Sequence, residues 1–143
     1  VPPVRAEGPL VAQAERALQT MEDAFADLAY NDAFGAVWQL IRDANAYIED
    51  SQPWALNKAG DTEATAAVLG DCLEALRIVA LLASPVLPRA SAELWRRLGL
   101  AGDPTQGRVP TDAAWGAVPT AGNALEKGPA LFPRLDVAAE PAE

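Results

Sequence analysis

Apolar residues recur every three to four positions along most of this chain. The first series follows Pro9 and consists of Val11, Ala14, Leu18, Met21, Phe25 and Leu28. This spacing brings the side chains to one side of an α-helix, and a proline suits the first turn of such a helix. The pattern therefore predicts a helix that begins near Pro9 and faces a core.

A second helix is predicted after Asn31 or Asp32, because either side chain can cap a helix N-terminus. Its apolar face consists of Phe34, Val37, Trp38, Ile41, Asn45 and Ile48. Asn45 is polar, so we expect it to find a hydrogen-bond partner inside the bundle, and we expect Trp38 in the core. Pro53 ends this helix, since proline lacks an N–H donor and clashes with the preceding turn.

Two further helices are predicted downstream. Asp61 can cap the third, whose apolar positions are Leu69, Cys72, Leu73, Leu76, Val79, Ala80 and Ala83. Ser84-Pro85 ends it and is expected to start a fourth helix with a proline at its first position. The apolar side of that helix consists of Leu87, Ser91, Leu94, Trp95 and Leu98. Gly99 is its expected C-terminal stop.

These elements define the expected domain organisation. Residues 1–8 are interpreted as a linker and residues 9–100 as a helical bundle. Residues 101–130 hold many Gly, Pro and Thr residues without a sustained period. We expect residues 101–143 to form an irregular tail that packs back on the bundle, with Trp115 and Val118 as its anchors. The predicted fold class is all-α: a bundle of about four helices with a long irregular C-terminal tail.

The residue types that are missing exclude several functions. The chain has no His, which excludes a Ser-His-Asp triad and a His-ligated metal site. Cys72 is the only cysteine, which excludes an intrachain disulfide and a Cys-rich zinc site, and it fits a reducing, cytoplasmic location. No apolar run reaches the ~18 residues that would span a membrane. We expect a non-catalytic chain with no cofactor of its own.

The stretch from Asn45 to Lys58 is the strongest candidate for chemistry. It is predicted to run from the end of a helix, through the break at Pro53, to Trp54 and Lys58. An aromatic ring at a helix end beside a cation suits stacking on an unpaired RNA base, worth roughly 1–3 kcal/mol per base. The net charge of −9, from 20 acidic and 11 basic residues, opposes phosphate binding. Tight RNA binding would therefore need a larger partner surface.

Three motifs together resemble the anticodon-binding helical domain of methionyl-tRNA synthetases over roughly residues 9–136. They are Asn45-x-Tyr47 with Pro53-Trp54-x-Leu56-x-Lys58, then Leu82-x-x-Pro85-x-Leu87-Pro88, and finally Pro129-x-Leu131-Phe132-Pro133-Arg134-Leu135. The resemblance implies that Trp54 stacks on a base of the CAU anticodon and that Pro53 shapes the turn presenting it. It also implies that Asn45 and Tyr47 support this turn from within the helix.

The resemblance implies further roles and partners. Glu49 takes the place of an acidic residue that disfavours wrong anticodons by charge repulsion, and Lys58 would contact a phosphate. The implied function is the anticodon-recognition part of a methionine–tRNA ligase, with the anticodon loop of tRNA(Met) as its partner. The family's H-I-G-H-like and K-M-S-K-S-like motifs do not occur here, so ATP and any zinc would belong to a missing catalytic part. That catalytic domain and a helix upstream of Val1 are the other implied partners, and without the helix apolar surface would be exposed.

Two alternatives remain at this point. The first is an acidic helical module that binds a partner helix in an apolar groove. The second is the related anticodon-binding domain of a leucine, valine or cysteine synthetase. The Pro-Trp and Leu-Phe-Pro-Arg pieces favour methionine. Separately, the alternative role for Trp54 is that of a core residue at a helix end.

Overall fold

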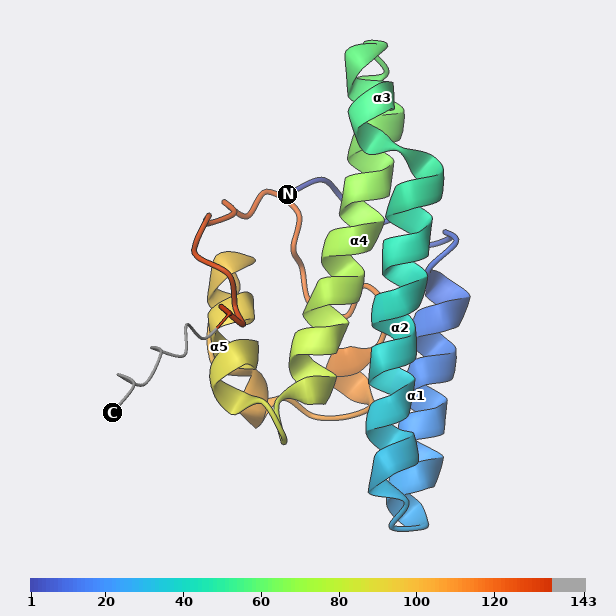
Figure 1. The fold of residues 1–143 in the computed structure, drawn as a ribbon, viewed down its shortest axis with the longest axis vertical. Helices are drawn as coiled ribbons and strands as arrows, with labels where there is room; N and C mark the ends of the chain where they lie inside the picture. The colour runs from blue at the N-terminus through green and yellow to red at the C-terminus, as the bar shows by residue number, and fades with distance from the viewer. Residues whose placement is uncertain (135–143) are drawn as a thin grey trace, which may run out of the picture.

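The computed structural model describes residues 1–134, and the predicted all-α fold is confirmed. The helices are α1 (Val11–Ala26), α2 (Tyr30–Ser51), α3 (Pro53–Lys58), α4 (Thr62–Ala83) and α5 (Pro88–Arg97), followed by the short 3-10 helices η1 (Pro104–Gln106) and η2 (Thr111–Ala113). Figure 1 shows α1, α2 and α4 side by side along the long axis, with α3 at one end and α5 beside α4. None of the helices in residues 1–134 is long and apolar enough to cross a membrane.

The contact between α1 and α2 is built largely from small side chains. Ala14 and Ala17 of α1 are buried, as is Ala33 of α2, and Met21 and Val37 complete the same region of the core. Alanine has the highest helix propensity and no long side chain to accommodate, so two helices rich in buried alanine can approach closely. The first two predicted helices therefore form a tight antiparallel pair.

The buried face of α2 differs from the predicted one. Ala33, Val37 and Leu40 are buried, whereas Trp38 is 44% exposed, so the assignment of Trp38 to the core is wrong. Asn45 is also exposed, so the predicted hydrogen bond inside the bundle is wrong too. The two candidate faces of α2 are neighbours around the helix. Because the small alanines allow the closest packing against α1, the larger residues of the other face lie at the flank.

The ends of α1 and α2 also depart from the prediction. The helix α1 ends at Ala26, and Leu28 follows in a left-handed conformation (φ 58°) with its side chain exposed. The helix α2 begins at Tyr30 with Ala29 as its N-cap residue and no side-chain cap, so the predicted caps at Asn31 and Asp32 are wrong. Asp32 instead lies in the first turn, where a negative charge favours the positive end of the helix dipole.

Of the helices in the described residues, α4 contains the most buried residues. Asp61 caps its N-terminus as predicted, and its side chain accepts a hydrogen bond from the Ala64 N–H at 2.9 Å. Leu69 and Leu76, predicted for the core, are 38% and 37% exposed. Fully buried positions of this helix instead include three charged residues that the apolar pattern had passed over, Asp71, Glu74 and Arg77. The fold must therefore supply polar partners for them.

The fourth predicted helix starts later than expected. Its first residue is Pro88 and its N-cap is Leu87, so the predicted start at Ser84-Pro85 is wrong by one turn. Its apolar side is confirmed, with Ser91 and Trp95 buried. Gly99 ends this segment in a left-handed conformation (φ 69°), as expected for a residue without a Cβ.

Beyond α5 the chain folds back over the bundle. The indole N–H of Trp115 donates to the Arg5 carbonyl at 2.8 Å, and Trp115 and Val118 both pack against the core. The N-terminal ammonium group of Val1 donates to the Asn123 carbonyl at 2.8 Å. Residues 1–8 contain no helix, yet these bonds hold them between α4 and the tail.

Candidate nucleic-acid interface

A sharp turn joins α2 to α3. The Gln52 N–H still bonds to the Ile48 carbonyl at 3.1 Å, but Gln52 itself adopts a left-handed conformation (φ 44°, ψ 61°). Pro53 follows as the first residue of α3, where a missing N–H costs nothing and the fixed φ suits a helix. The predicted break at Pro53 is confirmed: α2 ends at Ser51, α3 lies beyond it at the end of the bundle, and the chain turns back only after α3, where α4 begins (Figure 1).

The turn exposes one large aromatic side chain. Pro53 is buried, whereas Trp54, the next residue, is 55% exposed. At the other end of α3, the Asp61 N–H donates to the Leu56 carbonyl at 3.0 Å and closes the loop to α4, against which α3 packs. An indole on a short, hydrogen-bonded helix presents a flat apolar face to an incoming ring. The interpretation of Trp54 as a core residue is not compatible with this exposure.

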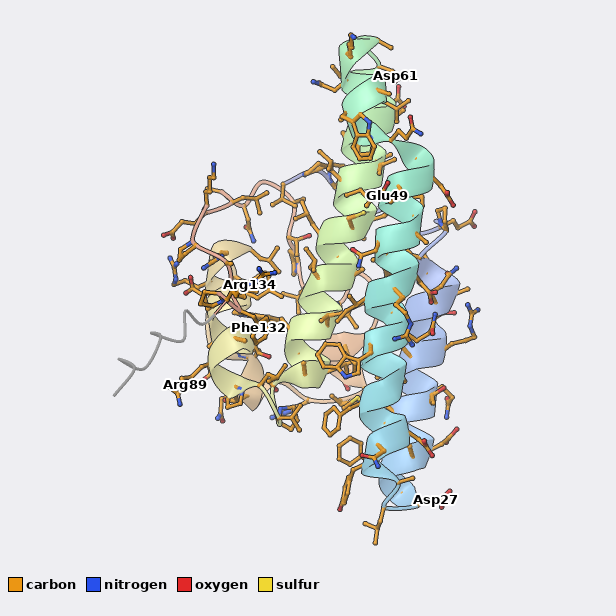
Figure 2. The ribbon with its side chains drawn as sticks, viewed as in Figure 1. Asp27, Glu49, Asp61, Arg89, Phe132 and Arg134 are labelled. Carbon is orange, nitrogen blue, oxygen red and sulfur yellow. The ribbon has the colours of Figure 1, made fainter. Side chains whose placement is uncertain are left out.

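The other predicted site residues lie in the last turns of α2 and in α3. Asn45 and Glu49 are both exposed and stand four residues apart, so they share one face of α2. Figure 2 shows Glu49 near the end of the bundle that carries α3 and Asp61, with Asp27 at the opposite end. Lys58 is exposed in the last turn of α3. The structure thus gathers all the predicted site residues at one end of the bundle.

This end of the bundle is acidic. Exposed carboxylates of Glu49, Asp50, Asp61 and Glu63 surround it, and Lys58 is the cation of the same segment. A surface with this charge repels phosphates. It can still accept the face or edge of a base that is turned out of an RNA loop.

Sequence reasoning missed the polar cluster behind the turn. The Tyr47 hydroxyl donates to Asp71 Oδ2 at 3.3 Å and accepts from Arg5 Nη2 at 3.2 Å. Arg5 also forms an ion pair with Asp71, and this bond raises the pKa of Arg5. Burial and the charge of Asp71 raise the pKa of Tyr47. The signal in the sequence was Asp71 itself, a carboxylate within an apolar helix.

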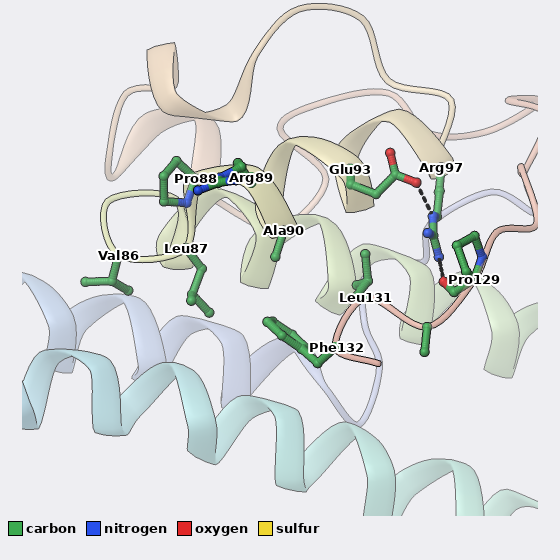
Figure 3. A pocket seen from close by; sticks show the side chains of 11 residues that line it. Val86, Leu87, Pro88, Arg89, Ala90, Glu93, Arg97, Pro129, Leu131 and Phe132 are labelled. Atoms are coloured by element: carbon green, nitrogen blue, oxygen red, sulfur yellow. Dashed lines mark hydrogen bonds and ion pairs between the residues drawn. The ribbon is translucent and has the colours of Figure 1, made fainter. Parts of the chain in front are cut away.

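An open pocket of about 610 Å³ lies elsewhere, between α5 and the tail (Figure 3). Its apolar lining includes Val86, Leu87, Leu131 and Phe132. Arg97 bridges the two walls, donating to Glu93 at 2.7 Å and to the Pro129 carbonyl at 2.7 Å. Hydrogen bonds from Arg96 and Arg97 lower the pKa of Glu93 to about 2. Leu135, the last residue of the third motif, lies outside the described residues.

Within residues 1–134, no group of three or more Cys, Asp or Glu side chains is placed to hold a metal ion. The main features of this end of the bundle are the exposed indole of Trp54 after Pro53 and the hydrogen bond between Asp61 and Leu56 that closes the following loop. They define a small helical recognition domain.

Comparison with known proteins identifies the family. The family model described as "Anticodon binding domain of methionyl tRNA ligase" matches residues 2–140. The chain therefore belongs to the family of anticodon-binding domains of methionyl-tRNA ligases. This result supports the main interpretation over an acidic interaction module and over the leucine, valine and cysteine synthetases.

Individual relatives agree. The chain is 35% identical over 132 residues to methionine–tRNA ligase 1 of Bacillus cereus, covering 92% of this chain and 20% of that protein. It is 32% identical over 142 residues to the methionine–tRNA ligase of Synechocystis, covering 94% and 26%. The crystal structure of the apo form of Mycobacterium tuberculosis methionyl-tRNA synthetase superposes with a TM-score of 0.75 at 29% identity, over 95% of this chain and 28% of that chain. The chain thus spans about a quarter or less of the curated relatives it matches.

Proposed function

We propose that this chain is the anticodon-recognition part of a methionine–tRNA ligase and that it binds the anticodon loop of tRNA(Met). The observation that supports this most directly is Trp54, whose indole is 55% exposed immediately after the buried Pro53. Such a ring can stack on an unpaired anticodon base at no cost of uncovering it first. Activation of methionine with ATP would take place in another part of the ligase, in the cytoplasm.

The side chains near Trp54 would discriminate between anticodon bases and contact the RNA backbone. Asn45 offers an amide that can donate to and accept from a base edge, and it is exposed on the same face of α2 as Glu49. Glu49 would repel loops that place a phosphate or a carbonyl-rich edge against it. Lys58, exposed at the end of α3, would contact the RNA backbone.

The acidic charge at this end of the bundle supports a model in which this chain contacts the bases and other parts of the ligase contact the phosphates. Four exposed carboxylates flank Lys58 in the sequence of this end of the bundle, so most phosphate contacts would come from other parts of the protein. Exposed apolar side chains on α2 and α4, namely Trp38, Leu69 and Leu76, support the same idea. We propose that an upstream helix and the catalytic domain of the ligase cover this apolar surface.

The test is binding of an anticodon stem-loop to the full-length ligase that contains this chain. The RNA carries either a CAU or a scrambled loop, and the variant is Trp54→Ala. If Trp54 stacks on a base, the variant loses roughly 1–3 kcal/mol of binding free energy for CAU and little for the scrambled loop.

Tyr30→Ala serves as the matched control. Tyr30 is 51% exposed, close to the value for Trp54. It is the first residue of α2, so a 22-residue helix, about 33 Å long, separates it from the turn. We expect Tyr30→Ala to bind both loops as the parent does. If Trp54→Ala also binds like the parent, the stacking proposal is wrong.

A further inference from the structure

Three segments that are far apart in the sequence meet at the buried carboxylate of Asp71. Asp71 lies in the middle of α4 with no exposed surface. Its Oδ1 accepts from Arg5 Nε at 3.2 Å, and its Oδ2 is paired with Arg5 Nη2 and accepts from the Tyr47 hydroxyl at 3.3 Å. The N-terminal segment, α2 and α4 are thus joined through one side chain.

Glycines make this meeting possible. A Cβ on Gly70 would lie 2.9 Å from the Pro3 carbonyl oxygen, and a Cβ on Gly8 would lie 3.0 Å from Asp71 Oδ2. Side chains at these two positions would push residues 1–8 away from α4. The N-terminal segment is therefore seated on α4 by close backbone packing as well as by the ion pair.

The cluster lies directly behind the candidate interface. Tyr47 precedes Ser51, the last residue of α2, by four residues, which is about 6 Å along the helix axis. Pro53 and Trp54 follow within three further residues. The hydroxyl of Tyr47, which is partly buried, therefore joins the last part of α2 to α4, about one turn before α2 ends.

We propose that Asp71 is a positioning residue for tRNA recognition: through Tyr47 it holds the last turn of α2, and with it the orientation of Trp54. The proposal rests on the proposed function. Arg5 extends the cluster to residues 1–8, so the position of that segment and the position of Trp54 are coupled through one carboxylate. Asp71 does not contact the RNA and acts only through its two partners.

The experiment uses the full-length ligase labelled with 5-fluorotryptophan, and the ¹⁹F resonance of Trp54 is assigned with Trp54→Phe. Tyr47→Phe removes one hydroxyl and leaves the ring in place; Asp71→Asn removes the charge. We expect both variants to shift the Trp54 resonance and to weaken binding of the CAU stem-loop by roughly three- to tenfold, which corresponds to the net contribution of one hydrogen bond. Val37→Ala, which truncates a buried side chain of the same helix outside the cluster, should lower the melting temperature and leave both readouts unchanged.

The outcomes separate the two proposals. If Trp54→Ala weakens binding while Tyr47→Phe and Asp71→Asn leave both the resonance and the affinity unchanged, the positioning role is wrong and the proposed function stands. If Trp54→Ala has no effect on binding, the base-stacking role proposed for Trp54 is wrong, and the positioning role fails with it. If Val37→Ala shifts the Trp54 resonance as much as Tyr47→Phe does, the effect is general destabilisation and the positioning role is again wrong.

Discussion

Glu74 and Arg77 lie one turn apart on α4, both fully buried, with Arg77 Nη2 2.7 Å from Glu74 Oε1. The remaining donors of Arg77 reach the tail, where they bond to the carbonyls of Asp112 at 2.6 Å and Ala114 at 2.8 Å. Glu74 Oε1 accepts from the Gly116 N–H at 2.8 Å. The pair therefore satisfies its own charges and also fastens residues 112–116 to the helical core.

Removal of one member of this pair should be costly. Arg77→Ala leaves the Glu74 carboxylate buried without its partner and also leaves two tail carbonyls without a donor. We expect the free energy of unfolding to fall by about 3–5 kcal/mol, as for other broken buried ion pairs. Urea denaturation of the 143-residue chain measures the loss.

Two further variants test the reason for that loss. Replacement of both members by apolar residues, Glu74→Leu with Arg77→Met, should destabilise less than Arg77→Ala, because no buried charge is left alone. Arg89→Ala, on the exposed side of α5, should change stability by no more than about 0.5 kcal/mol. If Arg77→Ala lowers the free energy of unfolding no more than Arg89→Ala does, the buried pair contributes nothing to stability.

The start of α4 depends on one side chain. The Asp61 carboxylate accepts from the Ala64 N–H at 2.9 Å and so satisfies one of the free backbone donors at this end. Asp61→Ala should lower the free energy of unfolding by about 1 kcal/mol. Glu63→Ala, which removes an exposed charge of the same first turn, is the control and should cost less. Thermal unfolding followed by circular dichroism compares the two, and equal costs would mean that the charge matters and the cap does not.

Two glycines inside helices should respond in opposite directions to the same substitution. A Cβ on Gly35 of α2 meets nothing within 4 Å, whereas one on Gly70 of α4 meets the Pro3 carbonyl at 2.9 Å. Gly35→Ala should stabilise the chain by about 0.5–1 kcal/mol through helix propensity. Gly70→Ala should destabilise it by roughly 1–3 kcal/mol through overpacking. Stabilisation by both, measured in urea, would show that residues 1–8 do not dock on α4 in solution.

The thiol of Cys72 should react slowly. Burial, with a further contribution from the charge of Asp71, raises its pKa from 9.0 to about 11. At pH 8 the thiolate fraction is then about 100-fold smaller than in the unfolded chain. We expect alkylation by iodoacetamide to be slower in the native chain by about that factor. Equal rates in native and denatured chains would contradict the raised pKa.

The same shift predicts how stability depends on pH. Because the pKa of Cys72 is higher in the folded chain, the folded state holds the thiol proton more tightly. This contribution to stability is fully present below about pH 9 and is lost as the pH rises through about 11. Cys72→Ala should therefore flatten the alkaline side of a plot of melting temperature against pH. An unchanged alkaline slope would show that other groups control it.

Part of the candidate interface was predictable. The sequence indicates that a helix breaks at Pro53 and that another is capped by Asp61, and the structure has the break and the helix cap at these residues. The exposure of Trp54 agrees with the predicted base-stacking role, which itself stays a proposal. The burial of Asn45 was predicted wrongly, because its spacing fits an apolar face that proved to be the flank of α2.

The sequence by itself determined the all-α class and three of the helix boundaries, at Pro53, Asp61 and Gly99. Proline without an N–H, aspartate as a cap and glycine at positive φ act on the backbone within a few residues, so Pro53, Asp61 and Gly99 could be interpreted locally. Only the tertiary structure decided which stripe of α2 faces inward and which distant groups pair. The Arg5–Asp71 ion pair spans 66 positions, and the bond from Gly116 to Glu74 spans 42. The periodicity of a single helix does not indicate where the C-terminal tail contacts α4, because that position depends on how the helices pack against one another.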